Sequence, residues 1–380
     1  MTPTLRVRDP QELLALIPYQ LGFQPRESVV VVSLREPHRR VGLVMRVDLA
    51  ALADPDDGPQ VARTMVTHVA RDRGRDTVLV VYTDASVPAV QDPRVPAWRA
   101  TGHYLGAAEA FLGEVDVWVV SGTGYWALGC ADPRCCPPGG RPLSDLSATV
   151  VGAEMVLAGA VVMATRDELA WIPRASDADR RRANAAANRW RRRAREAREA
   201  REARGQGASA LAQWRQAGFA TWRAALAGDM TAASLGRIEA ALEDIAVRDA
   251  VLLSMVPGTG GLPEEYLDEP VTQGSLATAT AVGRAMAAIV DPGAGVRPED
   301  DLASAALRAL EGVIAHGRRR HQAPALTLLA MLTWWRGSTA RSGALLERAY
   351  LCDPDYRLAR LLTQALEAGM APGWARGPGR

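Results

Sequence analysis

The chain has 380 residues, 48% of them hydrophobic and 23% charged, which is typical of a folded globular protein with two or three domains. Its formal net charge of +2 excludes a protein that coats nucleic acid or membranes with its whole surface, although all of its basic side chains except histidine are arginines. Four cysteines in a chain of this length exclude a secreted disulfide scaffold, and we expect a cytoplasmic protein.

The first 130 residues alternate between strand and helix patterns. A short helix is expected from Gln11 to the residue before Pro18, because that residue avoids helical angles. The β-branched run 28–34 is typical of a strand buried on both faces, and the run after the next turn predicts its hairpin partner. The expected strands are 28–34, 40–49, 77–84, 115–121 and, as a fifth, 125–130; the expected helices are 61–74 and 98–113. This alternation predicts an α/β domain with a mixed, partly parallel sheet.

After residue 143 every periodic segment has helical spacing, which predicts an all-α, repeat-like region. The apolar segment 144–164 carries Glu154 at its middle, so we expect one buried or half-buried helix there and no membrane span. Further single helices are expected over 177–204, 211–228 and 232–256. The predicted organisation is an α/β domain (1–142), a helical region (143–256), a loop with a linking helix (257–299) and a C-terminal repeat-like region (300–372).

The C-terminal repeat-like region contains one tetratricopeptide-like pattern. Gly337, Ala349 and Pro354 have the spacing at which small residues let two antiparallel helices approach and a proline ends the second helix. Ser342 departs from the pattern, which usually has alanine there. Because one repeat cannot form a solenoid alone, we expect the pair to pack on the preceding helices.

Three segments together resemble one known family. The opening LLALIPYQLGFQPRESVVVVSL with VGLVMRVDL, the motif YWALGCADPRCCPPGGRPL and the C-terminal helical pair are similar to an actinobacterial family, domain of unknown function 4192. The resemblance covers most of the chain apart from the arginine-rich segment 177–204. It implies a cytoplasmic α/β-plus-helical protein with the cysteine motif as a signature of the fold, and it implies no catalytic residue.

Three of the four cysteines fall within seven residues: Cys130, Cys135 and Cys136. Zinc and iron–sulfur sites usually need four ligands, and here Asp132 is the nearby candidate, while His103 or Cys352 would have to come from elsewhere. The vicinal pair is awkward on one ion, and the C-x-x-C dithiol spacing is absent. A structural turn fixed by prolines is therefore favoured, with bound zinc or iron, or thiol chemistry, as the alternatives.

The ends of the predicted strands supply a second set of candidates, since ligands of parallel sheets bind beyond the carboxyl ends of the strands. Asp84 and Ser121 follow two such strands. Arg46 and Asp48 lie two apart on one strand, so they share a face and either form an ion pair at the rim or line a site. The run at 121–124 has no lysine of a phosphate loop after it, which favours a hairpin turn.

The segment 180–204 holds eleven arginines, and five acids are interleaved with them over 177–204. Alanine, arginine and glutamate favour a helix, with (i, i+4) pairs at 192/196, 195/199 and 198/202. We expect this helix to be polar nearly all round, projecting into solvent or bridging two elements. Nucleic-acid binding is the sharper alternative, through four residues: Arg189, Trp190, Arg192 and Arg193.

The sequence contains none of the usual hydrolase or zinc-protease motifs. The leading hypothesis is therefore a non-catalytic binding or scaffold module whose helical region binds a protein partner. The first alternative is an enzyme that uses a thiol or metal site at the cysteine turn, and the second is nucleic-acid binding by the arginine-rich helix. No membrane partner is expected.

Overall fold

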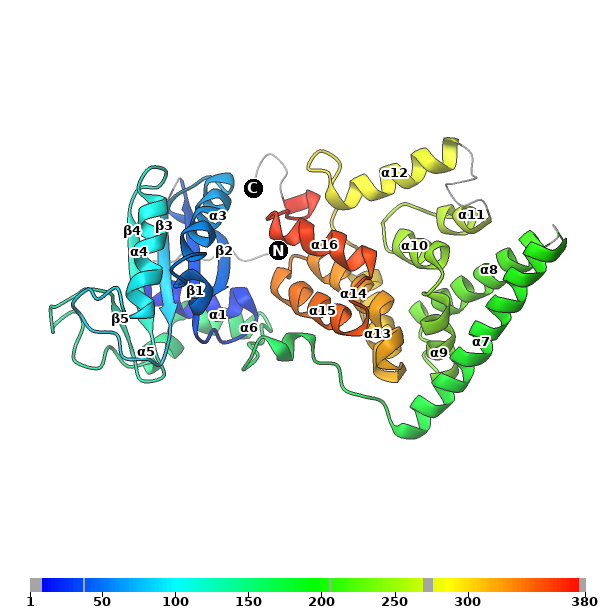
Figure 1. The fold of residues 1–380 in the computed structure, drawn as a ribbon, viewed down its shortest axis with the longest axis horizontal. Helices are drawn as coiled ribbons and strands as arrows, with labels where there is room; N and C mark the ends of the chain where they lie inside the picture. Colours follow the sequence, from blue (N-terminus) through cyan, green and yellow to red (C-terminus); the bar gives the residue numbers. More distant parts are fainter. Residues whose placement is uncertain (1–8, 37, 205–206, 269–275, 376–380) are drawn as a thin grey trace. The chain divides into compact units, whose positions relative to one another are not determined.

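The computed structural model describes residues 9–36, 38–204, 207–268 and 276–375. The chain divides into two compact units, Met1–Glu168 and Leu169–Arg380 (Figure 1). Every strand of the described residues lies in the first unit, whereas the second is built from helices. The predicted order of an α/β part followed by an all-α part is confirmed. In the described ranges, no helix combines the length and apolar content that a membrane span requires.

A five-stranded sheet forms the centre of the first unit, in the order β2–β1–β3–β4–β5. Strand β1 pairs antiparallel with β2 and β3, β3 pairs parallel with β4, and β4 pairs antiparallel with β5. The strands are β1 Ser28–Arg35, β2 Arg40–Asp48, β3 Gly74–Tyr82, β4 Val115–Val120 and β5 Tyr125–Ala127. The predicted hairpin, the partly parallel sheet and the fifth strand are therefore confirmed.

Strand β1 is buried on both faces, as its β-branched run predicts. Its four valines, 29–32, are all 0% exposed. Val29 and Val31 belong to an apolar cluster with α2 (Leu49–Leu52), α3 (Gly58–Arg71) and α4 (Pro96–Ala108). Because alternate residues point to opposite faces, the other two valines are buried on the second face. Figure 1 shows α3 and α4 beside the sheet.

The first helix is longer than expected, because α1 (Pro10–Leu21) continues through Pro18. A proline inside a helix removes one N–H donor and costs about 3 kcal/mol. Five leucine and isoleucine side chains of α1 are buried, and each contributes about 1.5–3 kcal/mol, which outweighs that cost. The helix ends instead at Gly22, whose φ of 80° is the left-handed conformation that glycine adopts without strain.

The single helix predicted over 144–164 is wrong. The segment forms two short helices, α5 (Ser144–Ser147) and α6 (Val150–Leu157), because Thr149 accepts the N–H of Gly152 and caps a new helix. Its expected burial is also wrong for most of α6, since Leu157 is 87% exposed.

The second unit packs its helices around buried tryptophans, among them Trp222, Trp334 and Trp335. Its helices are α7 Asp177–Arg204, α8 Gly207–Leu226, α9 Ala232–Ala241, α10 Ile245–Ser254, α11 Leu262–Asp268, α12 Leu276–Val290, α13 Asp300–His316, α14 Ala323–Trp335, α15 Thr339–Cys352 and α16 Arg357–Glu367. Helices α14 and α15 pack together, and α13 and α16 also contact α14. Ser342 is fully buried in α15.

One helix was expected over 232–256, but the structure has two, α9 and α10, joined at Asp244. The Asp244 carboxylate accepts the N–H groups of Ala246 and Val247, which starts α10. The same carboxylate pairs with Arg215 of α8 at 2.9 Å and with Arg198 of α7 at 3.2 Å. One buried aspartate therefore ties three helices together.

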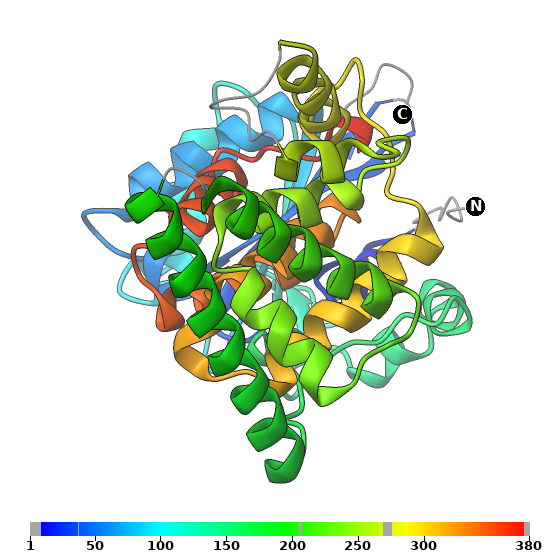
Figure 2. The ribbon, with the colours of Figure 1, turned by 90° about the vertical axis from the view of Figure 1, so that its right-hand side faces the viewer.

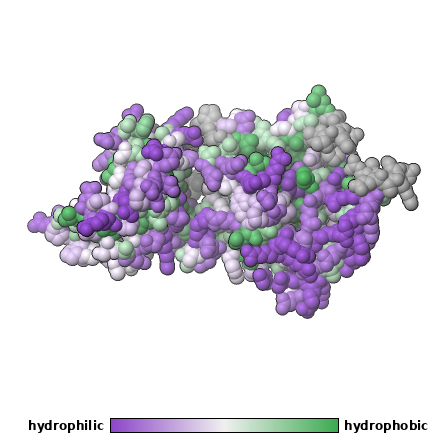
Figure 3. Space-filling view, viewed as in Figure 1, coloured by the Kyte–Doolittle hydropathy of each residue, from purple (hydrophilic) through white to green (hydrophobic). Residues whose placement is uncertain are grey.

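The arginine-rich helix α7 forms as predicted, but the expectation that it is polar nearly all round is wrong. Its alanines 183, 186, 187, 194 and 197 and Trp190 are buried. A Cβ at Gly236 would overlap the Ala183 backbone, so α7 and α9 approach too closely for a side chain there. Figure 2 shows α7, the long dark green helix, running beside other helices of its unit, and its outer surface is hydrophilic (Figure 3).

Replacing Asp244 by alanine is expected to lower the free energy of unfolding of the helical unit by about 3–5 kcal/mol, because it strips Arg215 of its buried partner and uncaps α10. Denaturant unfolding followed by far-ultraviolet circular dichroism measures the change. The control is Asp300→Ala, at an aspartate 96% exposed and 4.0 Å from Arg336, which should cost less than about 1 kcal/mol. Equal losses for the two variants would contradict the role of Asp244.

Candidate functional site

The candidates predicted at the strand ends all lie at one edge of the sheet. Ser28, the first residue of β1, pairs with Asp48 of β2 and with Tyr82 of β3, so these strand ends are adjacent. Arg46 and Asp48 pair with each other at 2.6 Å. Asp84 accepts the N–H of Gly122 at 2.6 Å, which links the ends of β3 and β4.

Sequence reasoning missed Glu27 at this edge. Its backbone has a φ of 40°, uncommon for a residue with a side chain. Its carboxylate accepts the Thr83 hydroxyl at 3.0 Å and the Asp84 N–H at 3.1 Å. Ser121 bonds to the Gly124 carbonyl in the following turn. The polar groups of this edge thus hold one another and the turns in place.

The cysteine motif lies in a loop that two backbone hydrogen bonds close. Tyr125 and Arg141 exchange N–H···O bonds of 3.0 and 2.8 Å, so the residues between them form one excursion from the sheet. Within it, the N–H groups of Cys135 and Cys136 both bond to the Asp132 carbonyl, at 3.1 and 2.8 Å. This tight turn folds the CADPRCC stretch back on itself.

The turn brings the three cysteine sulfurs together: the Sγ atoms of Cys130, Cys135 and Cys136 all lie within 4.8 Å of one another. The vicinal pair is not an obstacle, since its two sulfurs are 3.9 Å apart. Asp132 is not in this group; one of its carboxylate oxygens accepts the Arg134 N–H at 2.9 Å. His103 is engaged elsewhere, with Nδ1 2.8 Å from the Leu52 carbonyl.

The three thiols are not equivalent. The backbone N–H of Asp132 lowers the pKa of Cys130, whereas burial raises the pKa of Cys136 to about 11. Arg141 donates from Nε to the Cys135 carbonyl at 2.7 Å, and its Nη2 lies 3.6 Å from the Cys135 sulfur. A cation therefore stands beside the cluster, where it stabilises negative charge on sulfur.

The nucleic-acid candidates on α7 are divided by the packing. Trp190 is 7% exposed, and its ring stacks on Trp214 with centroids 5.7 Å apart. Arg193 lies over the Trp190 ring at 5.7 Å. Arg189 and Arg192 are exposed, and Arg192 is 3.8 Å from Glu196. A nucleobase has no free tryptophan face here, because protein side chains cover it.

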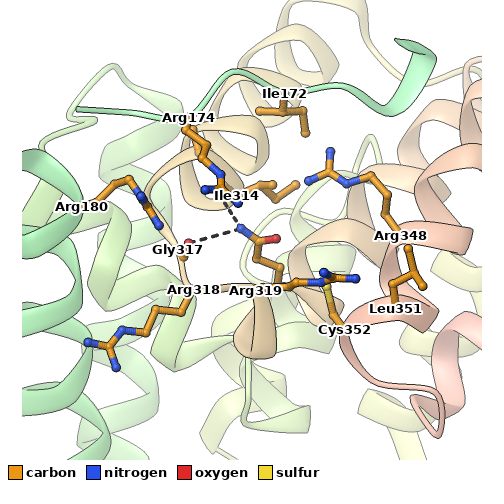
Figure 4. Close-up of a pocket in the computed structure, with 12 residues that line it drawn as sticks. Ile172, Arg174, Arg180, Ile314, Gly317, Arg318, Arg319, Arg348, Leu351 and Cys352 are labelled. Carbon is orange, nitrogen blue, oxygen red and sulfur yellow. Dashed lines mark hydrogen bonds between the residues drawn. The ribbon is translucent and has the colours of Figure 1, made fainter. Parts of the chain in front are cut away.

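A cavity of about 380 Å³ in the helical unit gathers arginines that the sequence did not point to. Its lining comes from the segment before α7, the first turn of α7, the last turn of α13 with the connection after it, and the end of α15 (Figure 4). Five lining residues are arginines: Arg174, Arg180, Arg318, Arg319 and Arg348. The other lining residues are Ile172, Ile314, Ala315, Gly317, Gln322, Leu351 and Cys352, so no carboxylate is among them.

The cavity concentrates positive charge. Arg180 pairs with Asp177 at 3.4 Å, but none of the other four has an ion pair with a carboxylate of the described residues. Burial lowers the pKa of Arg348, and the like charges of Arg174 and Arg319 lower it further. Burial also raises the pKa of the Cys352 thiol, against the opposing effect of the neighbouring arginines. A site with these properties favours an anionic occupant.

Packing orders part of this cavity. Arg348 donates to the Ala170 carbonyl, and Gln322 donates to the carbonyls of Ile314 and Gly317 at 2.7 and 3.3 Å. The only sequence signal was the triplet of arginines 318–320, which is not periodic and lies far along the chain from Arg174 and Arg348.

The two units define a two-part architecture, a mixed-sheet α/β unit with a cysteine turn and a helical unit with an arginine-lined cavity. The chain belongs to the family described as Domain of unknown function (DUF4192), whose model matches residues 10–266 and 275–373. Comparisons with curated proteins and with solved structures found no match. The actinobacterial origin stays a prediction.

The chelator-treated chain should be alkylated at Cys130 at least about tenfold faster than at Cys136 at pH 8. The thiolate is the reacting species, so the thiol with the lowered pKa reacts faster than the one whose pKa is raised to about 11. Peptide mapping by mass spectrometry after timed exposure to iodoacetamide measures the two rates. The difference should shrink in 6 M guanidinium, and its persistence there would show that the fold is not its cause.

Proposed function

We propose that this chain is a non-catalytic binding protein whose helical unit takes up a small phosphate-bearing anion in the arginine-lined cavity. The observation that supports this proposal is the set of five arginines around one cavity without a lining carboxylate. A planar guanidinium group can donate two parallel hydrogen bonds to two oxygens of one phosphate. Each such charged hydrogen bond contributes about 1.5–3 kcal/mol.

The residues that line the cavity also narrow the chemical class of the ligand. The lining contains no aromatic ring on which a nucleobase would stack, and its apolar side consists of Ile172, Ile314 and Leu351. A compact polyphosphate or a phosphate ester of a short aliphatic group suits this chemistry better than a nucleotide. The size of the cavity, about 380 Å³, suits a small molecule.

Binding is favoured over turnover by the groups present. Cys352 is the only lining side chain other than arginine that titrates, and burial raises its pKa, so it is a poor nucleophile near neutral pH. The cavity lies beside the end of α15, in the pair that resembles a tetratricopeptide repeat. A protein partner on this helical surface and a cytoplasmic location stay predictions, as does an enzyme acting at the cysteine turn.

The test is calorimetric titration of the full chain with pyrophosphate at constant ionic strength. We expect saturable binding, and the double variant Arg174→Gln/Arg319→Gln should bind at least tenfold more weakly, because two guanidinium groups are lost from the lining. The matched control is Arg181→Gln/Arg357→Gln, which removes the same charge from exposed positions of α7 and α16. It should stay within about twofold of the parent chain.

Two results would overturn this proposal. One is that pyrophosphate binds no more tightly than sulfate at the same ionic strength, because non-specific attraction of anions to the arginines would then account for the binding. The other is equal weakening in the cavity variant and the control. Thermal unfolding gives a second readout, because a ligand that binds only the folded chain raises its midpoint.

A further inference from the structure

The cysteine turn has the geometry of a metal site. Tetrahedral zinc with Zn–S bonds of about 2.3 Å needs sulfurs about 3.8 Å apart. Cys135 and Cys136 have their sulfurs 3.9 Å apart, and Cys130 completes a group whose ligand atoms all lie within 4.8 Å. One ion would fit against all three sulfurs with small adjustments of the side-chain torsions.

The burial of the three cysteines argues against a purely apolar role. A structural cysteine acts as a small hydrophobic residue and is usually among the most buried side chains. Here Cys130, Cys135 and Cys136 are all free thiols of intermediate exposure. Neither burial nor disulfide bonding accounts for their convergence.

Hydrogen-bond donors face two of the three sulfurs. The Ala127 N–H donates to the Cys136 sulfur at 3.3 Å, and Arg141 approaches the Cys135 sulfur to 3.6 Å. Backbone donors and a neighbouring cation lower the energy of sulfur ligands and orient them around a metal. The Tyr125–Arg141 bridge that closes the loop also places this cation.

We propose that Cys130, Cys135 and Cys136 bind one Zn²⁺ ion, with the fourth position left to water or another small ligand. Three thiols lose their protons to solvent as the three Zn–S bonds form. Three thiolates and Zn²⁺ carry a net charge of −1, which the Arg141 guanidinium offsets. Iron–sulfur clusters usually need a fourth thiolate, which this turn does not supply. The site is independent of the anion cavity in the helical unit.

The experiment titrates the reduced, chelator-treated full chain with Zn²⁺. We expect one ion per chain by elemental analysis after desalting, proton release into a weakly buffered solution, and protection of three of the four thiols from alkylation. Cys135→Ser should lose stoichiometric zinc. The matched control Cys352→Ser, which removes the thiol of the helical unit, should still bind one zinc and protect all three of its remaining thiols.

Three outcomes would overturn the proposal: no zinc above the level of the Cys130→Ser/Cys135→Ser/Cys136→Ser variant, equal loss in Cys352→Ser, or copurification of iron with sulfide. Thiol protection in the parent chain needs no variant, so it decides the matter even if a substitution unfolds the turn. Failure here leaves the pyrophosphate experiment unaffected, because the two readouts use different residues.

A second variant tests the charge balance. Arg141→Gln keeps a hydrogen-bond donor toward the Cys135 carbonyl but removes the cation, so zinc affinity should fall by about tenfold, the usual cost of altering a group behind the ligands. Competition with a chromophoric chelator measures the affinity. The comparison is Arg134→Gln, which removes a neighbouring positive charge and should leave the zinc affinity unchanged. If Arg141→Gln binds zinc as tightly as Arg134→Gln does, Arg141 has no part in the site.

Discussion

The pairing of arginine with buried carboxylate is the interaction on which the helical unit depends. Asp244 is held between Arg198 and Arg215, and Glu239, 2% exposed, is held by Arg191 of α7 at 3.0 Å. A buried carboxylate left without such a partner would destabilise the fold by several kcal/mol. These contacts fix α7 against its neighbours and make a long, highly charged helix part of a packed core.

The arginine-lined cavity differs from these pairs, because four of its five arginines have no ion pair with a carboxylate of the described residues. In a chain with 45 arginines and no lysine, a guanidinium is the default cation, and the half-buried Arg191 and Arg215 pair with carboxylates. Arg174, Arg318 and Arg319 are exposed and line the same cavity as the half-buried Arg348, and these are the four that form no ion pair with a carboxylate of the described residues. Positive charge gathered at one site attracts anions from solution.

The α/β unit differs from the helical unit in where its polar side chains find partners. At the ends of its strands, Glu27, Asp84 and Arg46 already form hydrogen bonds or ion pairs with neighbouring protein groups. The loop closed by Tyr125 and Arg141 is freer, and it directs three sulfurs to one point. The sheet thus carries a turn in which three thiols lie close together.

The local sequence pattern was sufficient to predict several features of the fold. The buried valines of β1, the hairpin, the partly parallel sheet and the existence of α7 follow from periodicity and propensity. Where single helices were expected, caps divided them at Thr149 and Asp244, because one side-chain oxygen competes with the helical backbone. At Pro18, where the helix was expected to end, it continues instead, because the burial of its apolar side chains outweighs the local cost of the proline.

The sequence by itself determined the two-part architecture, the family and the clustering of three cysteines within seven residues. Only the tertiary structure decided that their sulfurs converge, because the vicinal pair meets Cys130 through a turn set by the Asp132 carbonyl. Only the tertiary structure gathered Arg174, Arg319 and Arg348, which are far apart in the chain and share no motif. Spacing along a chain predicts contacts within an element, whereas a cavity between elements depends on how they pack.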